Sequence, residues 1–172
     1  MMRHLTPADY SVMPWANGKG TTIELLKIVE NGRMTWRLSR ASVVENGDFS
    51  IFPGVERNLT VLTGPGFDLV GEGVRLPARP LVPVSFAGDI PIRAEAVTAP
   101  SDDFNVMTDR AFPRPEVAVV TGCAQIPAGG TLAVYALTAA TVNGRQIAAH
   151  DLILTEEGLC LSGQVLVVRL LG

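Results

Sequence analysis

Glycine and proline recur every few residues along the whole chain, and this punctuation is the feature that most limits what the chain can fold into. There are 17 glycines and 12 prolines in 172 residues. The segments between them are short and rich in Val, Ile, Thr and Leu, a composition typical of β-strands separated by turns. No segment keeps an apolar period of 3.6 residues over three turns, so little helix is expected. The sequence therefore predicts an all-β chain.

Roughly a dozen strands are expected from this pattern. Two connections carry Asn-Gly pairs, Asn31-Gly32 and Asn143-Gly144, which favour tight hairpin turns because both residue types tolerate a positive φ. The expected strands cover residues 22–29, 35–44, 59–63, 66–71, 82–86, 90–97, 104–108, 117–122, 131–137, 141–146, 151–156 and 164–170.

A weak internal repeat emerges when the chain is shifted against itself by 75 positions. The Leu-Thr pair at 62–63 then falls on the pair at 137–138, and Gly88 falls on Gly163. Because both anchors share one offset, a duplicated β-module is one interpretation, and coincidence between two β-rich stretches is the other. Two jelly-roll-like halves would cover each other's open sheet edges.

The composition argues against several classes of protein. Hydrophobic residues make up 47% of the chain and charged residues 18%, which is enough for a core and argues against extended disorder. The net charge is −3 and the pI about 5.4, so no basic face for nucleic acid or anionic lipid is expected. No apolar run reaches the roughly 18 residues that a membrane span needs, despite a mean hydropathy of +0.28. The N-terminus has no apolar signal segment, so a cytoplasmic location is expected, with neither nucleic acid nor membrane as a partner.

Histidine and cysteine are too scarce for the common metal and nucleophile sites. His4 and His150 lie far apart in the sequence, so no three-His or His-x-His centre is expected, and we expect no metal and no cofactor. Catalysis by a Ser-His-Asp or Cys-His arrangement would have to use one of these two histidines. Cys123 and Cys160 are too few for a disulfide framework and are expected to be buried thiols.

Alternation along T-W-R-L-S-R-A-S, residues 35–42, separates Arg37 and Ser39 from Trp36 and Leu38. If the Arg37 face points inward, the buried charge needs an anionic partner, either a ligand carboxylate or a protein Asp or Glu. If the Trp36 face points inward, Arg37 is a solvated surface charge. Alternation alone leaves both alternatives open.

The segment G-D-F-S-I-F-P-G-V-E-R-N-L-T-V-L-T-G, residues 47–64, places Arg57 just before an apolar run. A guanidinium is suited to bidentate capture of a carboxylate, so Arg57 is a candidate binding residue. Phe49 and Phe52 are expected to form a hydrophobic clamp around the Pro-Gly turn.

Two further segments concentrate polar groups. P-W-A-N-G-K-G-T-T, residues 14–22, lacks the spacing of a phosphate-binding loop, but its glycines would let backbone approach a ligand closely. F-N-V-M-T-D-R, residues 104–110, alternates so that Asn105 and Met107 share one face.

Taken in chain order, 14–22, 35–42, 47–64 and 104–110, these four blocks resemble the HutD/Ves family of bacterial proteins over residues 4–110 and more loosely beyond. The resemblance implies a bicupin, in which two jelly-roll-like β-barrel modules pack together and the metal-binding histidines of most cupins are missing. It places an N-terminal module with a ligand pocket over residues 1–110 and a smaller C-terminal module over 111–172, with exchange of strands between them as an option. Cupins often dimerise through sheet edges, so a homodimer is an expectation from fold-level analogy.

The resemblance implies a small-molecule binder or regulator rather than an established enzyme. HutD members are associated with histidine utilisation and are thought to sense or bind a pathway metabolite such as N-formyl-L-glutamate, and Ves members are linked to stress at low temperature. Carried over motif by motif, the ligand-binding residues would be Trp15, Asn17, Arg37, Ser39, Arg57, Asn105 and Arg110.

The leading hypothesis is a metal-free cupin that binds a small carboxylate through Arg57 and Arg37 and acts as a sensor or regulator. One alternative is a cofactor-free isomerase, lyase or hydrolase acting on an amino-acid or sugar derivative, with Glu24 or Asp48 as the base. Another is a protein-interaction module whose pocket is vestigial.

Overall fold

Strands make up nearly all of the regular structure, as the sequence predicts. The computed structural model describes residues 1–15, 18 and 20–172, and within them the helical element is one 3-10 helix, η1 (Pro7–Asp9). The strands are β1 (Arg3–Leu5), β2 (Ser11–Pro14), β3 (Thr21–Glu30), β4 (Arg33–Val43), β5 (Gly47–Asp48), β6 (Val55–Thr63), β7 (Phe67–Gly71), β8 (Val74–Ala78), β9 (Val84–Ala87), β10 (Arg93–Glu95), β11 (Ser101–Asp109), β12 (Glu116–Ile126), β13 (Thr131–Ala136), β14 (Ala140–Val142), β15 (Arg145–Ile147), β16 (Leu152–Thr155) and β17 (Leu159–Leu170).

Both Asn-Gly hairpins are confirmed. Asn31 and Gly32 connect β3 to β4 with φ of 51° and 76°, and Asn143 and Gly144 connect β14 to β15 with φ of 48° and 78°. The second turn divides the range 141–146, which was expected to be one strand, into two. Strand β8 was missed because it contains a proline, which an edge strand tolerates.

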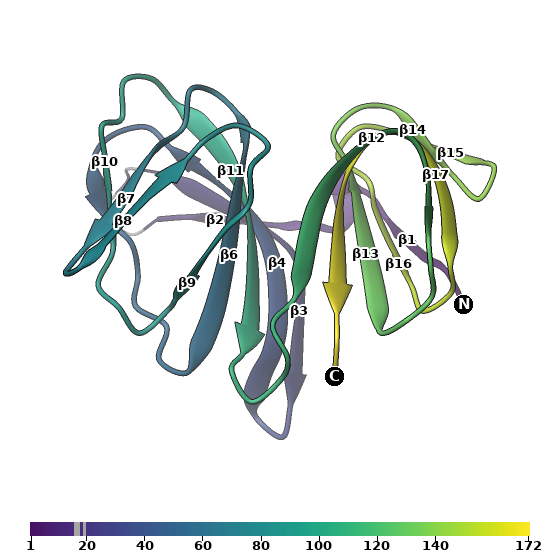
Figure 1. The fold of residues 1–172 in the computed structure, drawn as a ribbon, viewed down its shortest axis with the longest axis horizontal. Coiled ribbons are helices and arrows are strands. Elements are labelled where there is room, and N and C mark those ends of the chain that lie inside the picture. The colour runs from purple at the N-terminus through teal and green to yellow at the C-terminus, as the bar shows by residue number, and fades with distance from the viewer. Residues whose placement is uncertain (16–17, 19) are drawn as a thin grey trace. The chain divides into compact units, whose positions relative to one another are not determined.

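The chain divides into two units, residues 11–112, called here the N-terminal unit, and residues 1–10 with 113–172, the C-terminal unit. The modules expected from the sequence, 1–110 and 111–172, differ from these units mainly in the first ten residues. Those residues join the C-terminal unit because β1 pairs with β16, which Figure 1 shows as a purple strand beside the green and yellow ones. A strand from the beginning of the chain thus completes the sheet formed by its end.

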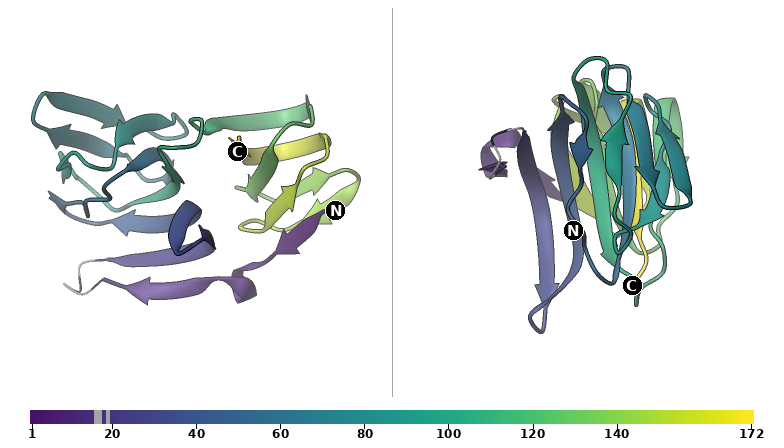
Figure 2. Two further views of the ribbon diagram at one scale, coloured as in Figure 1. Left: turned by 90° about the horizontal axis from the view of Figure 1, so that it is seen from below. Right: turned by 90° about the vertical axis from the view of Figure 1, so that its left-hand side faces the viewer.

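The N-terminal unit contains two sheets. One has the strand order β2-β3-β4-β11-β6-β9 and the other β5-β10-β7-β8 (Figures 1 and 2). Apolar side chains from both sheets form one core cluster, which includes Leu59 and Val61 on β6 and Phe67 and Leu69 on β7. The inner face of the six-stranded sheet therefore forms one wall of this core.

The C-terminal unit contains one seven-stranded sheet, with the order β1-β16-β13-β17-β14-β15 and with β12 paired to β17. Its core cluster comes mainly from β13, β14 and β17 and includes Leu132, Val134, Val142, Leu161 and Val165. The 75-residue offset does not match equivalent elements, because Gly88 follows β9 whereas Gly163 lies inside the long strand β17.

The expectation of buried thiols is wrong. Cys123 on β12 and Cys160 on β17 are both exposed and free. Cys123 lies in a run of three exposed positions on β12, and Cys160 occupies an exposed position between the buried Leu159 and Leu161 on β17. Within the described ranges, no helix is long and apolar enough to cross a membrane.

Candidate functional site

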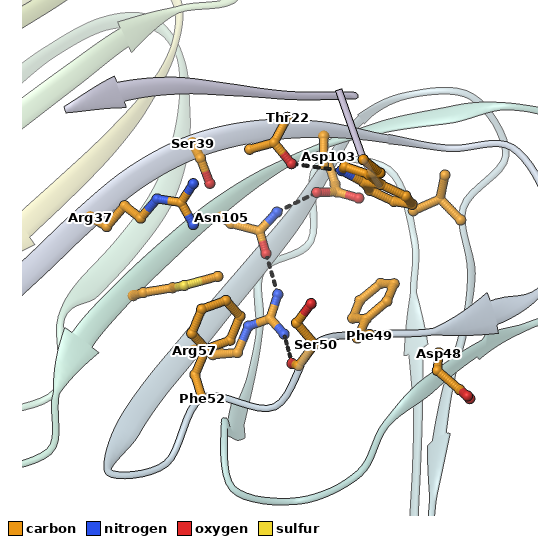
Figure 3. Close-up of a pocket in the computed structure, with 14 residues that line it drawn as sticks. Thr22, Arg37, Ser39, Asp48, Phe49, Ser50, Phe52, Arg57, Asp103 and Asn105 are labelled. Atoms are coloured by element: carbon orange, nitrogen blue, oxygen red, sulfur yellow. Dashed lines mark hydrogen bonds between the residues drawn. The ribbon is translucent and has the colours of Figure 1, made fainter. Parts of the chain in front are cut away.

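A cavity of about 400 Å³ opens on the inner face of the six-stranded sheet in the N-terminal unit (Figure 3). Its walls come from β3, β4, β6 and β11, from Trp15 after β2 and from the loop after β5. The lining residues are Trp15, Thr22, Arg37, Ser39, Ala41, Val43, Asp48, Phe49, Ser50, Phe52, Arg57, Asp103, Asn105 and Met107.

Strand register brings the two candidate arginines into one row. Met107 on β11 lies opposite Arg37 on one neighbouring strand and opposite Arg57 on the other. The next position along β11 on the same face, Asn105, lies opposite Ser39. The structure thus answers the question that alternation left open, because the Arg37 and Ser39 face of β4 lines the cavity.

Arg57 is almost completely buried, with 6% of its surface exposed, and three phenylalanine rings surround its guanidinium. The guanidinium carbon lies 5.4 Å from the ring centroids of Phe49 and Phe52 and 5.0 Å from that of Phe86. Burial, together with the nearby positive charge of Arg37, lowers the pKa of Arg57 to about 10, against the opposing effect of Asp103. Arg57 therefore remains a cation at neutral pH in an apolar cage.

Two hydrogen bonds hold the Arg57 side chain. One terminal nitrogen donates to Oδ1 of Asn105 at 3.0 Å and the other to the backbone carbonyl oxygen of Ser50 at 3.4 Å. The buried Nε has no hydrogen-bond partner among the residues that the structure describes. No carboxylate of the described chain accepts a direct hydrogen bond from this guanidinium.

The side chain of Asn105 connects Asp103 to Arg57. Nδ2 of Asn105 donates to Oδ1 of Asp103, so the Asn105 amide is held between the acid and the guanidinium. Burial raises the pKa of Asp103 from 3.8 to about 7, against the lowering effects of the Asn105 hydrogen bond and the Arg57 charge. Its other oxygen, Oδ2, is buried and has no hydrogen-bond partner within the described part of the chain.

Trp15 and Arg37 are also held by specific contacts. Nε1 of Trp15 donates to Oγ1 of Thr22 at 2.8 Å, and Nε of Arg37 donates to Oε2 of Glu24 at 2.7 Å. A Cβ at Gly20 would lie 2.7 Å from the Trp15 ring, so only glycine lets the indole occupy this position. The ion pair with Glu24 leaves Arg37 at the cavity wall with its charge partly balanced.

Five of the seven residues predicted for the site line the cavity: Trp15, Arg37, Ser39, Arg57 and Asn105. Their contact with a ligand stays a prediction. Asn17 lies outside the described residues.

Arg110 does not line the cavity. It follows the end of β11, where it forms an ion pair with Asp89 and donates a hydrogen bond to the carbonyl oxygen of Val55. In this chain the arginine of the N-V-M-T-x-R motif therefore makes contacts that hold the end of β11 to neighbouring segments.

Sequence reasoning missed Asp103 and Phe86. Asp103 has the same period-two spacing on β11 as Asn105 and Met107, so alternation was the signal that could have found it. Phe86 lies opposite Arg57 on the neighbouring strand β9, a pairing that no local sequence pattern reveals. Phe49, expected as part of a clamp around a turn, packs on the Arg57 guanidinium as well.

Each of the two histidines has a side-chain partner in the C-terminal unit. His4 Nε2 lies 2.8 Å from Oδ2 of Asp151, and the hydroxyl of Tyr135 lies 2.8 Å from Nδ1 of His150. In the described ranges, no group of three or more His, Cys, Asp or Glu side chains is placed to hold a metal ion.

The cavity of the N-terminal unit combines two cationic side chains, an acid whose pKa lies near neutrality and aromatic walls. Glu24, one of the bases considered from the sequence, is engaged with Arg37. Asp48, the other, lines the cavity, but Figure 3 shows its side chain directed away from Arg57. The arrangement is suited to binding an anion, and it contains one group, Asp103, that could move a proton near pH 7.

Comparison with known sequences identifies a family and several relatives. The family model described as HutD matches residues 7–168. An uncharacterized 21.2 kDa protein in the hutC 3' region of Pseudomonas putida is 38% identical over 108 residues, covering 60% of this chain and 56% of that protein. Protein Ves of Cronobacter sakazakii is 39% identical over 116 residues, covering 64% of each chain. The matches thus span less than two thirds of the length of these relatives.

Solved structures show the same fold over nearly the full length. HutD from Pseudomonas fluorescens SBW25, solved in a formate condition, has a TM-score of 0.91 at 28% identity and covers 99% of this chain and 98% of that one. A conserved protein of unknown function from Pseudomonas aeruginosa PAO1 has a TM-score of 0.89 at 30% identity, with both chains fully covered. A bacterial pirin from Escherichia coli, 10% identical with a TM-score of 0.69, shares the fold alone. These likenesses confirm the predicted cupin-type fold.

Proposed function

The chain belongs to the HutD family, and from this premise we propose that it binds a small carboxylate metabolite in the cavity of residues 11–112. N-formyl-L-glutamate or a related compound is the first candidate, and the role is that of a sensor or regulator in histidine utilisation or in a stress response. The observation that carries the proposal is the placement of Arg57 and Arg37 on the wall of one cavity.

Two guanidinium groups in one cavity favour an anion between them. Arg37 and Arg57 flank Met107 in a single cross-strand row, and the charge of Arg37 helps to lower the Arg57 pKa. Burying a cation without a directly bonded carboxylate costs desolvation energy that a ligand anion would offset. A carboxylate offers two acceptor oxygens in the geometry that a guanidinium binds best.

The rest of the cavity suits a small, partly polar molecule. Its volume of about 400 Å³ lies toward the lower end of the range typical of small-molecule sites, which is about 300–1,000 Å³. Ser39 and Asn105 supply polar groups beside the arginines, and Trp15 and the phenylalanines supply apolar walls. This mixture of one charged end and apolar surroundings is typical of sites that orient a ligand by its acid group.

The names of the relatives guide the choice of ligands to test. One relative is named for its position beside hutC, and one solved relative was obtained in a formate condition. N-formyl-L-glutamate carries both a formyl group and carboxylates, so it and formate belong at the head of the panel.

The test is a thermal-shift and calorimetric titration of the metal-stripped protein with N-formyl-L-glutamate, formate, glutamate, urocanate and a set of sugar acids. A ligand at 100 times its Kd stabilises the folded state by about 2.7 kcal/mol, which raises Tm by about 5–10 °C for a chain of this size. A selective shift with one carboxylate supports the proposal. A flat response to the whole panel contradicts it and favours an interaction module, which a pull-down from cell extract would then examine.

Two arginine variants make the titration specific to the cavity. Arg57→Met keeps a straight apolar side chain between the phenylalanine rings, so it should fold and lose binding by at least tenfold. Arg93→Ala is the control, because Arg93 is half-exposed on β10 and pairs only with Glu95 among the described residues. Unchanged affinity in Arg57→Met would contradict the assignment.

A cofactor-free enzyme is the second candidate, because one acid in the cavity has a pKa near the operating pH. Asp103, with its pKa raised to about 7 by burial, meets the usual requirement for a general acid or base better than Glu24, which is engaged with Arg37. Turnover of a panel compound that is lost in Asp103→Asn but kept in Asp102→Asn would favour this alternative.

A further inference from the structure

The cavity contains an ionisable group that carboxylate binding at the arginines does not by itself require. Asp103 is 1% exposed, lines the cavity and has one oxygen without a hydrogen-bond partner among the described residues. A buried carboxylate in this condition is costly, whereas the neutral acid in the same place is far less so. Its charge state therefore depends closely on the other charges of the cavity.

A continuous chain of hydrogen bonds connects this acid to the proposed anion site. Asn105 donates to Asp103 through its amide nitrogen and accepts from Arg57 through its amide oxygen (Figure 3). Because both partners are identified, the amide can face only one way. Arg57 and Asp103 therefore interact through one fixed side chain as well as through space.

The charged groups around Asp103 come from every element packed against it. Arg57 on β6 favours its ionised form, and Asp102, the preceding residue on β11, opposes it. Arg37 on β4 is balanced by Glu24 on β3 through their ion pair. Asp48, at the end of β5, is directed away from the Arg57 guanidinium (Figure 3).

Among the described cavity residues, the ionised Asp103 is thus the negative charge that stabilises the Arg57 cation. A ligand carboxylate at Arg57 would bring a second negative charge into the same desolvated space. Two negative charges in one desolvated site repel each other strongly, so the weaker acid takes up a proton.

We infer that carboxylate binding at Arg57 is coupled to protonation of Asp103, so that either the ligand or Asp103 carries the negative charge that balances Arg57. This inference rests on the proposed function. When Asp103 is ionised in the free protein, one carboxylate anion and one proton from solvent enter the cavity. The proton binds an oxygen of Asp103, and no other bond changes. The cavity then keeps the same net charge with and without ligand.

The coupling has a definite direction with pH. Below about pH 7 Asp103 is already neutral in the free protein, so binding takes up no proton and affinity is independent of pH. Above that pH the free protein must gain a proton in order to bind, so Kd rises by up to about tenfold per pH unit. A sensor built in this way would respond to carboxylate concentration and to acidity together.

The experiment is isothermal titration calorimetry with formate as the probe, between pH 6 and 8.5, with the titration at pH 8 made both in HEPES and in Tris. These two buffers differ in ionisation enthalpy, so the difference in measured heat counts the protons taken up. For the wild-type protein at pH 8 we expect close to one proton per formate and an affinity about tenfold weaker than at pH 6. Formate that binds without proton uptake and with the same Kd at every pH would overturn the inference.

Asp103→Asn keeps the shape of the side chain and removes the ionisation. Its proton uptake should vanish, and its Kd at pH 8 should match its Kd at pH 6. Asp102→Asn is the matched control on the same strand, outside the cavity lining. It should still take up close to one proton at pH 8, with the onset of uptake moved to lower pH because the Asp102 charge raises the pKa of Asp103. Uptake that persists in Asp103→Asn would overturn the inference, and if this variant does not fold, the proton count of the wild type decides alone.

The same titration separates this inference from the proposed function. Absence of binding by formate and by N-formyl-L-glutamate at every pH, in the wild type and in Asp103→Asn, would contradict the proposed function and with it the coupling. Binding to the cavity without proton uptake would leave the proposed function in place and overturn the coupling alone.

Discussion

The interior of the N-terminal unit and that of the C-terminal unit differ in what they bury. Between its two sheets the N-terminal unit places Arg57, Asn105 and Asp103 beside an apolar cluster. The core cluster of the C-terminal unit consists of aliphatic side chains such as Leu132, Val134 and Leu161. The C-terminal unit has ionisable groups as well, but they gather where the N-terminal strand meets the turn before β16.

This difference supports the proposed location of the binding site. Burying a cation and an acid that are not in direct contact destabilises a fold relative to apolar side chains of the same size. Such groups persist in natural proteins where binding or catalysis needs them. The comparison therefore supports the proposal that residues 11–112 bind the ligand, whereas the core of residues 1–10 and 113–172 is aliphatic.

Shortening a core side chain of the C-terminal unit should have the largest effect on stability. Leu161 is 1% exposed on β17, so Leu161→Ala should lower the free energy of unfolding by about 2–5 kcal/mol. Because Leu161 lies outside the cavity unit, the folded fraction should bind formate with the wild-type Kd. Urea denaturation and calorimetry measure the two quantities, and a loss of affinity beyond the loss of folded protein would break the comparison.

Removing the buried acid should stabilise the protein in a pH-dependent way. The pKa of Asp103 is raised to about 7 in the folded protein, so the folded state holds a proton that the unfolded chain releases near pH 4. Stability contributed by this proton is present at low pH and is lost as pH rises to about 7. The change is on the order of 3 kcal/mol between these limits.

The measurement is Tm of the wild type and of Asp103→Asn from pH 4 to pH 8. The Tm of the variant minus the Tm of the wild type should increase steadily up to neutral pH and should then level off. A constant difference across this range would show that burial does not disfavour the ionised form of Asp103 relative to the neutral form. The two interiors would then differ less than we infer.

The indole at the cavity wall should contribute a smaller amount to binding. Trp15→Phe removes the hydrogen bond from Nε1 to Thr22, so the free energy of unfolding should fall by about 1 kcal/mol. It also shortens the apolar wall of the cavity, so Kd for a bound carboxylate should rise by a few-fold. Trp36→Phe is the matched control, since Trp36 lies next to Arg37 on β4 but on the opposite face. Equal effects of the two substitutions in calorimetry would argue against Trp15 as part of the binding wall.

The smallest effect is expected at Arg110. It and Asp89 are 46% and 40% exposed, and exposed ion pairs contribute about 0–1 kcal/mol to stability. Arg110→Ala should therefore leave Kd unchanged and lower Tm by no more than a few degrees. A tenfold loss of affinity would indicate that Arg110 contributes to ligand binding, as the family motif predicts.

Much of the fold could be predicted because its determinants are local. Asn31-Gly32 and Asn143-Gly144 turn the chain through backbone preferences that need no tertiary context. The pairing of β1 with β16 could not be predicted, because it joins residues from opposite ends of the chain. The exposure of Cys123 could not be predicted either, since it depends on which face of β12 packs on a neighbour.

The candidate site divides along the same lines. Arg57 and Asn105 stand out by residue type and motif, but the inward direction of Arg37 required the sheet to be known. Phe86 joins the cage around Arg57 through cross-strand pairing. The raised pKa of Asp103 arises from complete burial, which no sequence pattern reports.

The central claim is that ligand binding belongs to the N-terminal unit and centres on Arg57. The most direct test follows backbone amide and indole NMR signals while formate, and then N-formyl-L-glutamate, is added to isotope-labelled protein. We predict shifts along β4, β6 and β11 around Arg57 and at the Trp15 indole, with signals of residues 113–172 unchanged. Shifts centred on β13 to β17, or no shifts at saturating concentrations of both compounds, would contradict the account.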